Sequence, residues 1–441
     1  MTFTESFFSR PKSIVLLGEN NKKNKKINLI IHGQGVFLFE NQENNHFCCF
    51  EIYDNEEKNG LKIEFNDKKV IVNKLPSFDP LLDENNKQGL TTKKGAYYWF
   101  SIDSQNQKLQ AGIGEARIEN VIYQYSFPNE ERKKNKSFLE SLVTIDLTIN
   151  NINPLKLLRD PITSKVPLLV KNTEQLKMKH IANSTYLPKP HLSLVAQQLY
   201  DCIAGKHFIL DDKDFPDFSK AIEYSIATPG LWCHEKIKDK SKEFDEKKPN
   251  ILETYLRITL NENNGESPGI PYVMEIWPVG HFSPIHNHGG ANAIIRVLHG
   301  KINVKLFSFL CQEDSIEPFN KVQFVKDDIT WISPTLNQVH QLENLEKNTD
   351  TCITIQCYMY DDKDKSHYDY FDYLDSKGNK KQYEPDSDMD FITFKETMKQ
   401  EWSNRPRIVK SINETTSHLF STAKKPFYSI GNLGKQFFSQ K

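Results

Sequence analysis

The sequence has no long apolar run and almost no net charge. Its longest uninterrupted apolar stretch is AYYWF, five residues from Ala96 to Phe100. A membrane-spanning helix needs about 20 such residues, so no membrane span is expected. Lys plus Arg number 57 and Asp plus Glu number 58, which leaves a formal net charge of −1. Nucleic acid is therefore not an expected partner, because phosphate contacts need a basic surplus.

Paired cysteines are also lacking. The seven cysteines are odd in number and form no CxxC pair, and only Cys48 and Cys49 are adjacent. This usage suggests neither a disulfide framework nor a zinc cluster. The N-terminus, MTFTESFFSRPK, has no basic start followed by an apolar stretch, so it does not read as a secretory signal. Together these features predict a cytoplasmic protein with reduced thiols.

Glycine and proline are scarce, whereas aromatic residues are plentiful. Gly and Pro number 19 and 21 of 441 residues, about 9% against roughly 12% in average proteins. With 28 Phe and 17 Tyr, the chain has ample material for a core, which excludes wholesale disorder. The length predicts two to four domains.

Residues 1–150 read as β throughout and predict a β-sandwich accessory domain. In the stretch 142–149, Val143, Ile145 and Leu147 alternate with polar residues, as in a half-buried strand. The candidate strands are Ile14–Leu17, Leu29–Phe39, Phe47–Ile52, Leu61–Val72, Tyr97–Ile102, Val121–Tyr125 and Leu142–Ile149.

The segment from Tyr97 to Glu115, YYWFSIDSQNQKLQAGIGE, resembles lectin-like β-sandwich accessory domains. Its Gly112 and Gly114 are predicted to be turn glycines, because no GxGxxG pattern or following helix supports a phosphate cradle. The partner of this domain stays unknown: carbohydrate binding, protein binding and packing against the next domain remain open.

The rest of the chain divides into a connector, a second β-rich domain and a tail. Residues 151–187 are a Pro- and Lys-containing connector, 188–382 form the second domain, and 383–441 are a tail with one helix. Apolar spacing predicts helices over 192–203, 215–226 and 391–402. The mixed charge run 236–248 is predicted to be an exposed loop. The fold class is thus mainly β.

The segment from Gly280 to Gly300, GHFSPIHNHGGANAIIRVLHG, carries the clearest chemistry. His286 and His288 are two residues apart, so on a strand both imidazoles point to one side. His340 follows in PTLNQVHQLEN. Three neutral imidazoles converging inside a small barrel would bind a divalent metal and leave coordination positions open.

These histidines stand in a pattern that resembles the cupin superfamily. Its first motif, G-x5-HxH-x3,4-E-x6-G, is matched by Gly280, His286, His288 and Gly300. Its second motif, P-x-G-x2-H-x3-N, is met with one inserted residue. The position of the cupin glutamate ligand holds Ala293, so the resemblance implies a metal site made of three histidines. The residues matching the second motif are Pro334, His340 and Asn344.

Residues from about 190 to 382 further resemble the cysteine dioxygenase family. The family's run YxRN…(W)GxGHxSxIHDH is matched by Tyr255-Leu256-Arg257 and by residues from Trp277 to His288. Its LHxxEN context is matched around His340, and Tyr358 stands where the family has a tyrosine on a later strand. The resemblance implies a cupin β-barrel with a few preceding helices.

The resemblance also implies a function. The enzyme would hold Fe(2+) on His286, His288 and His340 and use L-cysteine and O2 as substrates. Arg257 would bind the substrate carboxylate with its planar fork. Tyr358 would donate a hydrogen bond at the reacting centre, and Tyr255 would place a second hydroxyl near the carboxylate.

Two departures from the family affect what is expected. Ala293 stands where animal enzymes have a cysteine that crosslinks to the tyrosine, and bacterial members also lack this cysteine. The animal Ser-x-His-x-Tyr relay reads Thr354-x-Gln356-x-Tyr358, and an amide cannot exchange a proton near neutral pH. Two alternatives therefore stay open: a dioxygenase for 3-mercaptopropionate, cysteamine or N-terminal cysteine, and a non-catalytic metal-binding cupin that acts as a sensor or interaction protein.

Overall fold

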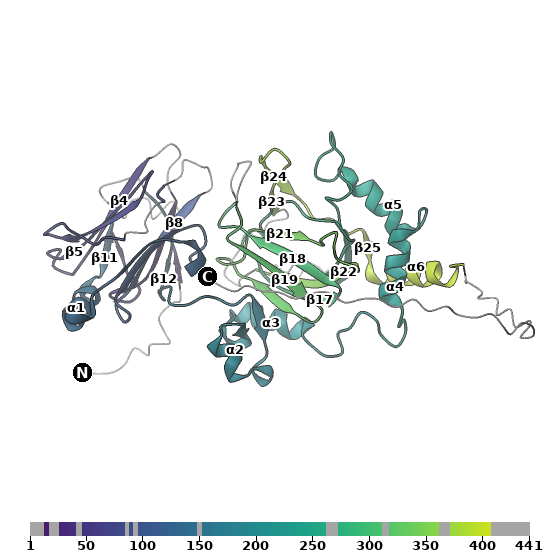
Figure 1. Cartoon of the computed structure of the whole chain (residues 1–441), viewed down its shortest axis with the longest axis horizontal. Coiled ribbons are helices and arrows are strands. Elements are labelled where there is room, and N and C mark those ends of the chain that lie inside the picture. Colours follow the sequence, from purple (N-terminus) through teal and green to yellow (C-terminus); the bar gives the residue numbers. More distant parts are fainter. Residues whose placement is uncertain are drawn as a thin grey trace, which may run out of the picture. The chain divides into compact units, whose positions relative to one another are not determined.

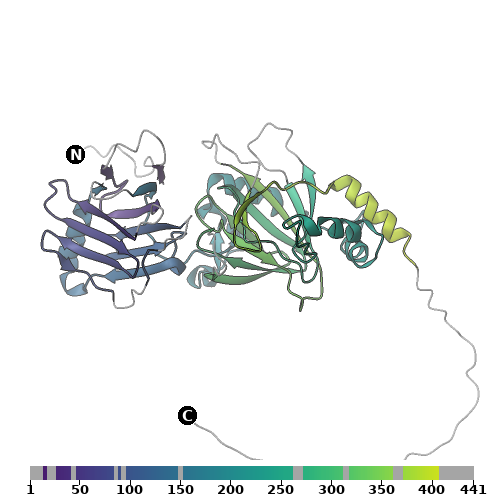
Figure 2. The ribbon, with the colours of Figure 1, turned by 90° about the horizontal axis from the view of Figure 1, so that it is seen from above.

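The computed structural model describes residues 13–16, 26–40, 46–83, 88–90, 96–147, 152–261, 272–310, 317–360 and 371–406. The described residues up to Ser403 belong to one compact unit. Figures 1 and 2 give two views of the ribbon. The chain is mainly β, as the sequence predicted, with a sandwich followed by a barrel and its helices.

The N-terminal part is a sandwich of two six-stranded sheets. One has the order β1-β12-β3-β8-β9-β10 and the other β2-β11-β4-β5-β6-β7. The strands are β1 (Ser13–Val15), β2 (Lys26–Asn28), β3 (Gln34–Glu40), β4 (Phe47–Tyr53), β5 (Gly60–Asn66), β6 (Val70–Leu75), β7 (Asp79–Pro80), β8 (Tyr97–Asp103), β9 (Lys108–Ile113), β10 (Val121–Ser126), β11 (Thr144–Asp146) and β12 (Asn153–Leu158).

Aromatic side chains from the two sheets meet in the core of the sandwich. Phe37 of β3 packs edge-on against Phe50 of β4, with ring centroids 5.2 Å apart. Phe39 contacts Phe65 of β5 in the same way at 5.3 Å. Such pairs stabilise beyond their buried area, and they explain why the phenylalanine-rich first third of the chain folds as two stacked sheets.

Not all of this part is β. The helix α1 (Arg132–Ser141) occupies RKKNKSFLES, so the prediction of β structure throughout residues 1–150 was wrong here. Only Asn135 and Leu139 of that helix are buried; their spacing of four fits a helix, but with Leu139 as the one apolar member of the pair they give no apolar stripe. The candidate strand Leu61–Val72 is instead a hairpin of β5 and β6, and Asn66 Oδ1 accepts the Lys68 and Lys69 amides in its turn at 2.9 Å.

The second part is a barrel built from an eight-stranded sheet and a three-stranded sheet, with a separate hairpin, β23-β24. The larger sheet has the order β14-β13-β20-β17-β22-β16-β15-β25 and the smaller β19-β18-β21. The strands are β13 (Leu169–Lys171), β14 (Tyr186–Pro188), β15 (Leu256–Asn261), β16 (Tyr272–Trp277), β17 (Asn292–His299), β18 (Lys301–Leu306), β19 (Asn320–Val325), β20 (Ile329–Ile332), β21 (His340–Glu343), β22 (Cys352–Met359), β23 (Phe371–Leu374), β24 (Lys380–Tyr383) and β25 (Met389–Asp390).

Helices cover the outer side of the larger sheet. Two of the three predicted helices begin two or three residues later than expected, and all three are present. Leu199 and Ile203 of α3 belong to the same buried cluster as Ile294 of β17, and α4 packs against α6 (Figure 1). The helices are α2 (Met178–Ala182), α3 (Leu194–Ile203), α4 (Phe218–Ala227), α5 (Trp232–Asp239) and α6 (Phe391–Ser403).

The charge run 236–248 is not simply an exposed loop. Its first four residues continue α5, and Lys240 is only 8% exposed. The ammonium of Lys240 lies 3.1 Å from Asp388 Oδ2, which explains how a lysine is tolerated there. Within the described residues, no helix is long and apolar enough to cross a membrane.

Candidate metal centre

The three predicted histidines come from two neighbouring segments of backbone. His286 and His340 exchange reciprocal backbone hydrogen bonds, each 3.0 Å from N to O. The predicted strand through His286 and His288 is reduced to isolated bridges at His286, because positive-φ Gly289 and Gly290 turn the chain directly after His288. Both rings nevertheless face the same side as His340.

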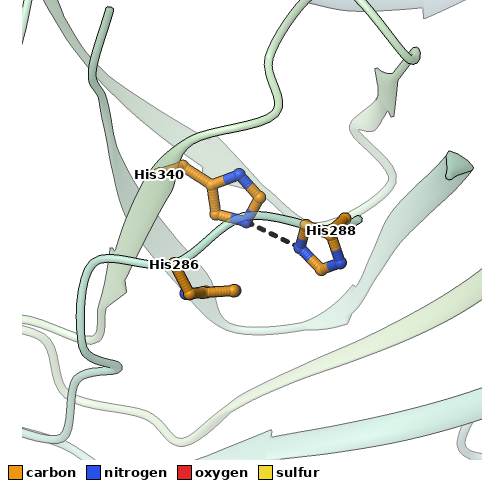
Figure 3. A group of neighbouring side chains, drawn as sticks. All are labelled: His286, His288 and His340. Atoms are coloured by element: carbon orange, nitrogen blue, oxygen red, sulfur yellow. Dashed lines mark hydrogen bonds between the residues drawn. The ribbon is translucent and has the colours of Figure 1, made fainter. Parts of the chain in front are cut away.

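The structure brings the three side chains into one cluster (Figure 3). One ring nitrogen from each histidine lies within 4.8 Å of the other two. The Nε2 atoms of His288 and His340 are 3.2 Å apart. Metal–nitrogen bonds of about 2.0–2.1 Å can be formed at such separations with small side-chain shifts. The cluster is thus consistent with a metal site.

Backbone carbonyls set the tautomers of two of these rings. Nδ1 of His286 lies 3.0 Å from the carbonyl oxygen of Pro284, and Nδ1 of His340 lies 3.1 Å from that of Asn337. Because a carbonyl only accepts, each Nδ1 carries the proton and each Nε2 presents a lone pair to the centre. Among described residues, buried Nδ1 of His288 has no hydrogen-bond partner. The donor set therefore fits a divalent metal.

Burial keeps the imidazoles in the neutral, metal-binding form. Desolvation lowers the pKa of His286 to about 4 and that of His340 to about 3. The pKa of His288 is lowered well below its ordinary value, first by burial and then by the neighbouring rings. Since protons compete with a metal for the same lone pairs, the cluster stays available at neutral pH.

The histidines open onto a cavity between the two sheets of the barrel. The cavity has a volume of about 60 Å³, and a single water needs about 10–15 Å³ on the same measure. There is thus room for several waters or one small molecule. Much of the wall is apolar and consists of Leu168, Ile295, Val297, Ile302, Val304, Leu306, Phe324, Ile332, Leu342 and Phe371.

A chain of polar side chains crosses this cavity. The Tyr358 hydroxyl donates to Gln356 Oε1, and Gln356 Nε2 donates to Glu275 Oε2. The other oxygen of Glu275 accepts from Arg257 Nη1 at 3.3 Å. All four residues line the cavity and are buried. Two predicted residues, Arg257 and Tyr358, therefore lie beside the histidines and are joined by two residues that hold them in place.

Burial raises the pKa of both Glu275 and Tyr358 in this polar chain. Burial raises the pKa of Glu275, while the Arg257 guanidinium beside it acts in the opposite direction. Burial, reinforced by Glu275, raises the pKa of Tyr358 well above its usual value. Its phenol is therefore protonated at neutral pH and can donate a hydrogen bond.

Tyr255 also lines the cavity. Its ring stacks on Trp277 with centroids 4.2 Å apart and planes inclined by 17°. Ala293 is fully buried and is the strand partner of Tyr358, so no carboxylate is present at the expected glutamate position. The roles predicted for Tyr255, Arg257 and Tyr358 stay predictions.

Glu275 was missed in the sequence. It stands in the strand sequence YVMEIW as a single acidic residue among apolar ones, and it is the direct strand partner of Arg257. A lone acid in a buried strand that follows a strand containing Arg is the signal that points to it, because buried charges are normally paired.

A scan against protein-family models finds no match. The barrel is similar to several solved structures. A putative sugar phosphate isomerase from Acidithiobacillus ferrooxidans is 14% identical over 31% of this chain and 79% of its own, with a TM-score of 0.21. The Cnp3 cupin domain of Schizosaccharomyces pombe is 14% identical over 24% and 65%, with a TM-score of 0.19.

A predicted oxalate decarboxylase from Thermotoga maritima is 14% identical over 24% of this chain and 79% of its own, again with a TM-score of 0.19. Similarity at this level carries no argument about chemistry. The sheets, the cavity and the three histidines define a β-barrel with a candidate metal centre.

Proposed function

We propose that the chain is an iron(II)-dependent thiol dioxygenase that adds both atoms of O2 to the sulfur of L-cysteine, giving cysteine sulfinate. One observation carries the proposal: three neutral imidazoles, with no carboxylate ligand, open onto the same small cavity as Arg257 and Tyr358. The thiol and O2 supply all the atoms of the sulfinic acid, so no additional reductant is needed.

The three histidines would hold the iron, which would supply Lewis-acid and redox chemistry toward the thiol and O2. A neutral ligand set leaves the full positive charge of the metal to attract the thiolate. Two of the Nε2 lone pairs are already directed by the carbonyls of Pro284 and Asn337. Such pre-oriented ligands favour metal binding.

Arg257 and Glu275 would divide the recognition of the amino-acid head group. One Nη1 proton of Arg257 is directed at Glu275, and a guanidinium has five N–H donors. The remaining donors would take the substrate carboxylate. Glu275 would in turn attract the ammonium group, so the buried pair suits a zwitterion better than a simple acid.

Tyr358 donates its one hydroxyl proton to Gln356 Oε1 in the structure, and it would turn that proton toward the reacting centre when substrate binds. Gln356 accepts or donates along the polar chain but releases no proton, so it acts by holding Tyr358 and Glu275. The apolar wall would limit water around the thiolate. A cytoplasmic location fits the thiol substrate and the described cysteines, among which Cys48, Cys202, Cys233, Cys352 and Cys357 are thiols rather than disulfides.

The direct test is anaerobic loading with Fe(II), then O2 uptake with L-cysteine and detection of cysteine sulfinate. Equal yields of sulfinate and consumed O2 are expected. An iron-loaded protein that forms no sulfinate from any small thiol contradicts the proposal.

The closest alternative is a dioxygenase for 3-mercaptopropionate, cysteamine or N-terminal cysteine. Glu275 disfavours 3-mercaptopropionate, which has no amine, and Arg257 disfavours cysteamine, which has no carboxylate. Parallel turnover of the thiols separates these substrates. A non-catalytic sensor, favoured by Gln356 at the relay position, would bind metal and cysteine tightly without consuming O2.

A further inference from the structure

The loop after β9, which the sequence predicted only as a glycine turn, carries a buried acid–base pair. Glu115 and Arg117 are each 1% exposed, and Arg117 Nη1 lies 3.3 Å from Glu115 Oε2. Gly114 has φ +73°, and a Cβ there would lie 2.2 Å from the carbonyl oxygen of Ser308. Position 114 thus requires glycine, because the turn lies directly against Ser308 in the segment that follows β18.

Both charged residues of this loop bind the segment that precedes His340. Arg117 Nη1 donates to Asn337 Oδ1 at 2.8 Å, and the amide of Gln338 donates to Glu115 Oε1 at 2.9 Å. The Arg117 guanidinium also lies 4.7 Å from the ring centroid of Phe319. Buried charged groups are costly unless they are paired, so these partners are held firmly.

Asn337 and Gln338 in turn hold the histidines. The carbonyl of Asn337 accepts the Nδ1 proton of His340 at 3.1 Å. Gln338 Oε1 accepts the amide of Gly290 at 3.1 Å, and its Nε2 donates to Ala291 O at 3.0 Å. The two glycine-turn contacts fix the chain directly after His288.

We infer that Glu115 and Arg117 of the N-terminal sandwich are positioning residues of the metal centre, acting through Asn337 and Gln338 on His340 and His288. The inference rests on the metal-binding part of the proposed function. It assigns the sandwich a role in building the site, in addition to any partner that its surface binds.

The test compares Co(II) affinity and the Co(II) ligand-field spectrum in full-length protein. The double variant E115Q/R117M removes the bond to Asn337 together with the buried Glu115–Arg117 pair, and Gln at 115 keeps an acceptor for the Gln338 amide. Glu119, which also pairs with Arg117, keeps Lys165 at 3.8 Å. Loss of partners that orient metal ligands costs about 10–100-fold in affinity. We expect at least a tenfold weaker Kd and a changed spectrum.

The matched control is Phe50→Leu, which loosens the sandwich core away from this loop. Phe50→Leu should lower the melting temperature about as far as the double variant does. If its Kd for Co(II) and its spectrum nevertheless stay at the wild-type values, loss of stability alone does not explain the effect of the double variant. The barrel-side variant Asn337→Gly, which tolerates the φ of +63°, serves if the double variant fails to fold. Combined with Arg117→Met, it should weaken affinity no further than Asn337→Gly alone.

A wild-type Kd and spectrum in E115Q/R117M overturn the inference, as do fully additive effects of Arg117→Met and Asn337→Gly. Because the readout is metal binding, a protein that binds Co(II) normally but forms no sulfinate refutes the dioxygenase proposal alone. A wild-type protein that binds no divalent metal refutes both.

Discussion

Glu275 changes what Arg257 can do in the cavity. An isolated buried guanidinium would favour any small anion, whereas one paired at 3.3 Å with a carboxylate presents a nearly neutral head-group site. Selectivity then depends on placing two charges of opposite sign correctly. At the scale of single residues, substrate choice is therefore expected to follow this pair more closely than the histidines.

Arg257→Gln should raise the KM for L-cysteine by about ten- to hundredfold, because a hydrogen bond to a charged group contributes about 1.5–3 kcal/mol. Glutamine keeps an N–H for Glu275, so the buried acid is not left unpaired. Steady-state O2 uptake measures the effect, and cysteamine, which has no carboxylate, is the control substrate. An unchanged KM for cysteine would discredit the carboxylate-binding role.

Site residues that stand in a local sequence motif could be predicted, whereas residues that reach the site through contacts distant in the sequence could not. The spacing of His286 and His288 and the context of His340 sufficed to bring the three rings together. The contact between Arg117 and Asn337 spans 220 positions, and nothing near either residue in the sequence indicates it.

At the scale of elements, the turn between β17 and β18 depends on Gly300. Its φ is +66°, and an added Cβ would lie 2.5 Å from the carbonyl oxygen of Thr351. Gly300→Ala should therefore destabilise the fold by about 1–3 kcal/mol, measured by denaturant unfolding. Gly205→Ala is the control, because a Cβ there meets nothing within 4 Å. Equal stability of the two variants would contradict the role of the turn.

The end of β17 is also linked to α4 by an ion pair that depends on pH. His299 Nε2 lies 3.3 Å from Glu223 Oε1, and this hydrogen bond raises the pKa of His299 above 6.5. A raised histidine pKa adds stability that is present below 6.5 and is lost as pH rises through the folded pKa.

Glu223→Gln should therefore cost more stability at pH 5.5 than at pH 8.5. Urea unfolding of both proteins at the two pH values measures the difference. The control is the same Glu223→Gln change made in a His299→Gln background. There its stability penalty should be equal at the two pH values. A Glu223→Gln penalty that is constant with pH would show that the pair does not titrate in this range.

Elements were predictable where their apolar spacing was strong. The helix over 192–203 was found because Val195, Leu199 and Ile203 are buried at helical spacing. In the helix over 391–402, the buried Phe394 and Met398 continue at helical spacing into the half-buried Trp402. The helix α1 has only two buried residues. In α5, which begins with WCHEK, the two buried residues Cys233 and Ile237 lie among charged residues, so the sequence shows no clear apolar spacing. Tertiary packing rather than periodicity stabilises such helices.

At the scale of the whole molecule, metal binding should be visible as stability. A metal held only by the folded state stabilises it by about 2.7 kcal/mol at 100 times its Kd. The melting temperature should rise with Co(II) and fall after chelation. His340→Ala should lose both the bound metal and this shift, whereas His299→Ala should retain them. A metal-dependent shift in His340→Ala would place the ion elsewhere.

The domain limits inferred from composition stay predictions, because the described residues up to Ser403 cluster as one unit. Within the predicted connector, β12 pairs with β3 of the sandwich and β13 pairs with β20 of the barrel. Strand pairing across long separations is the part of the fold that local sequence patterns specify least.

Gln356 prevents proton transfer along the polar chain across the cavity. It joins the phenol of Tyr358 to the carboxylate of Glu275 by hydrogen bonds, yet a proton cannot pass through an amide as it does through an imidazole. Tyr358 and Glu275 therefore gain and lose protons independently, and neither can protonate the other through Gln356. In the proposed reaction, a proton released from the thiol would therefore not be relayed between Tyr358 and Glu275 through Gln356.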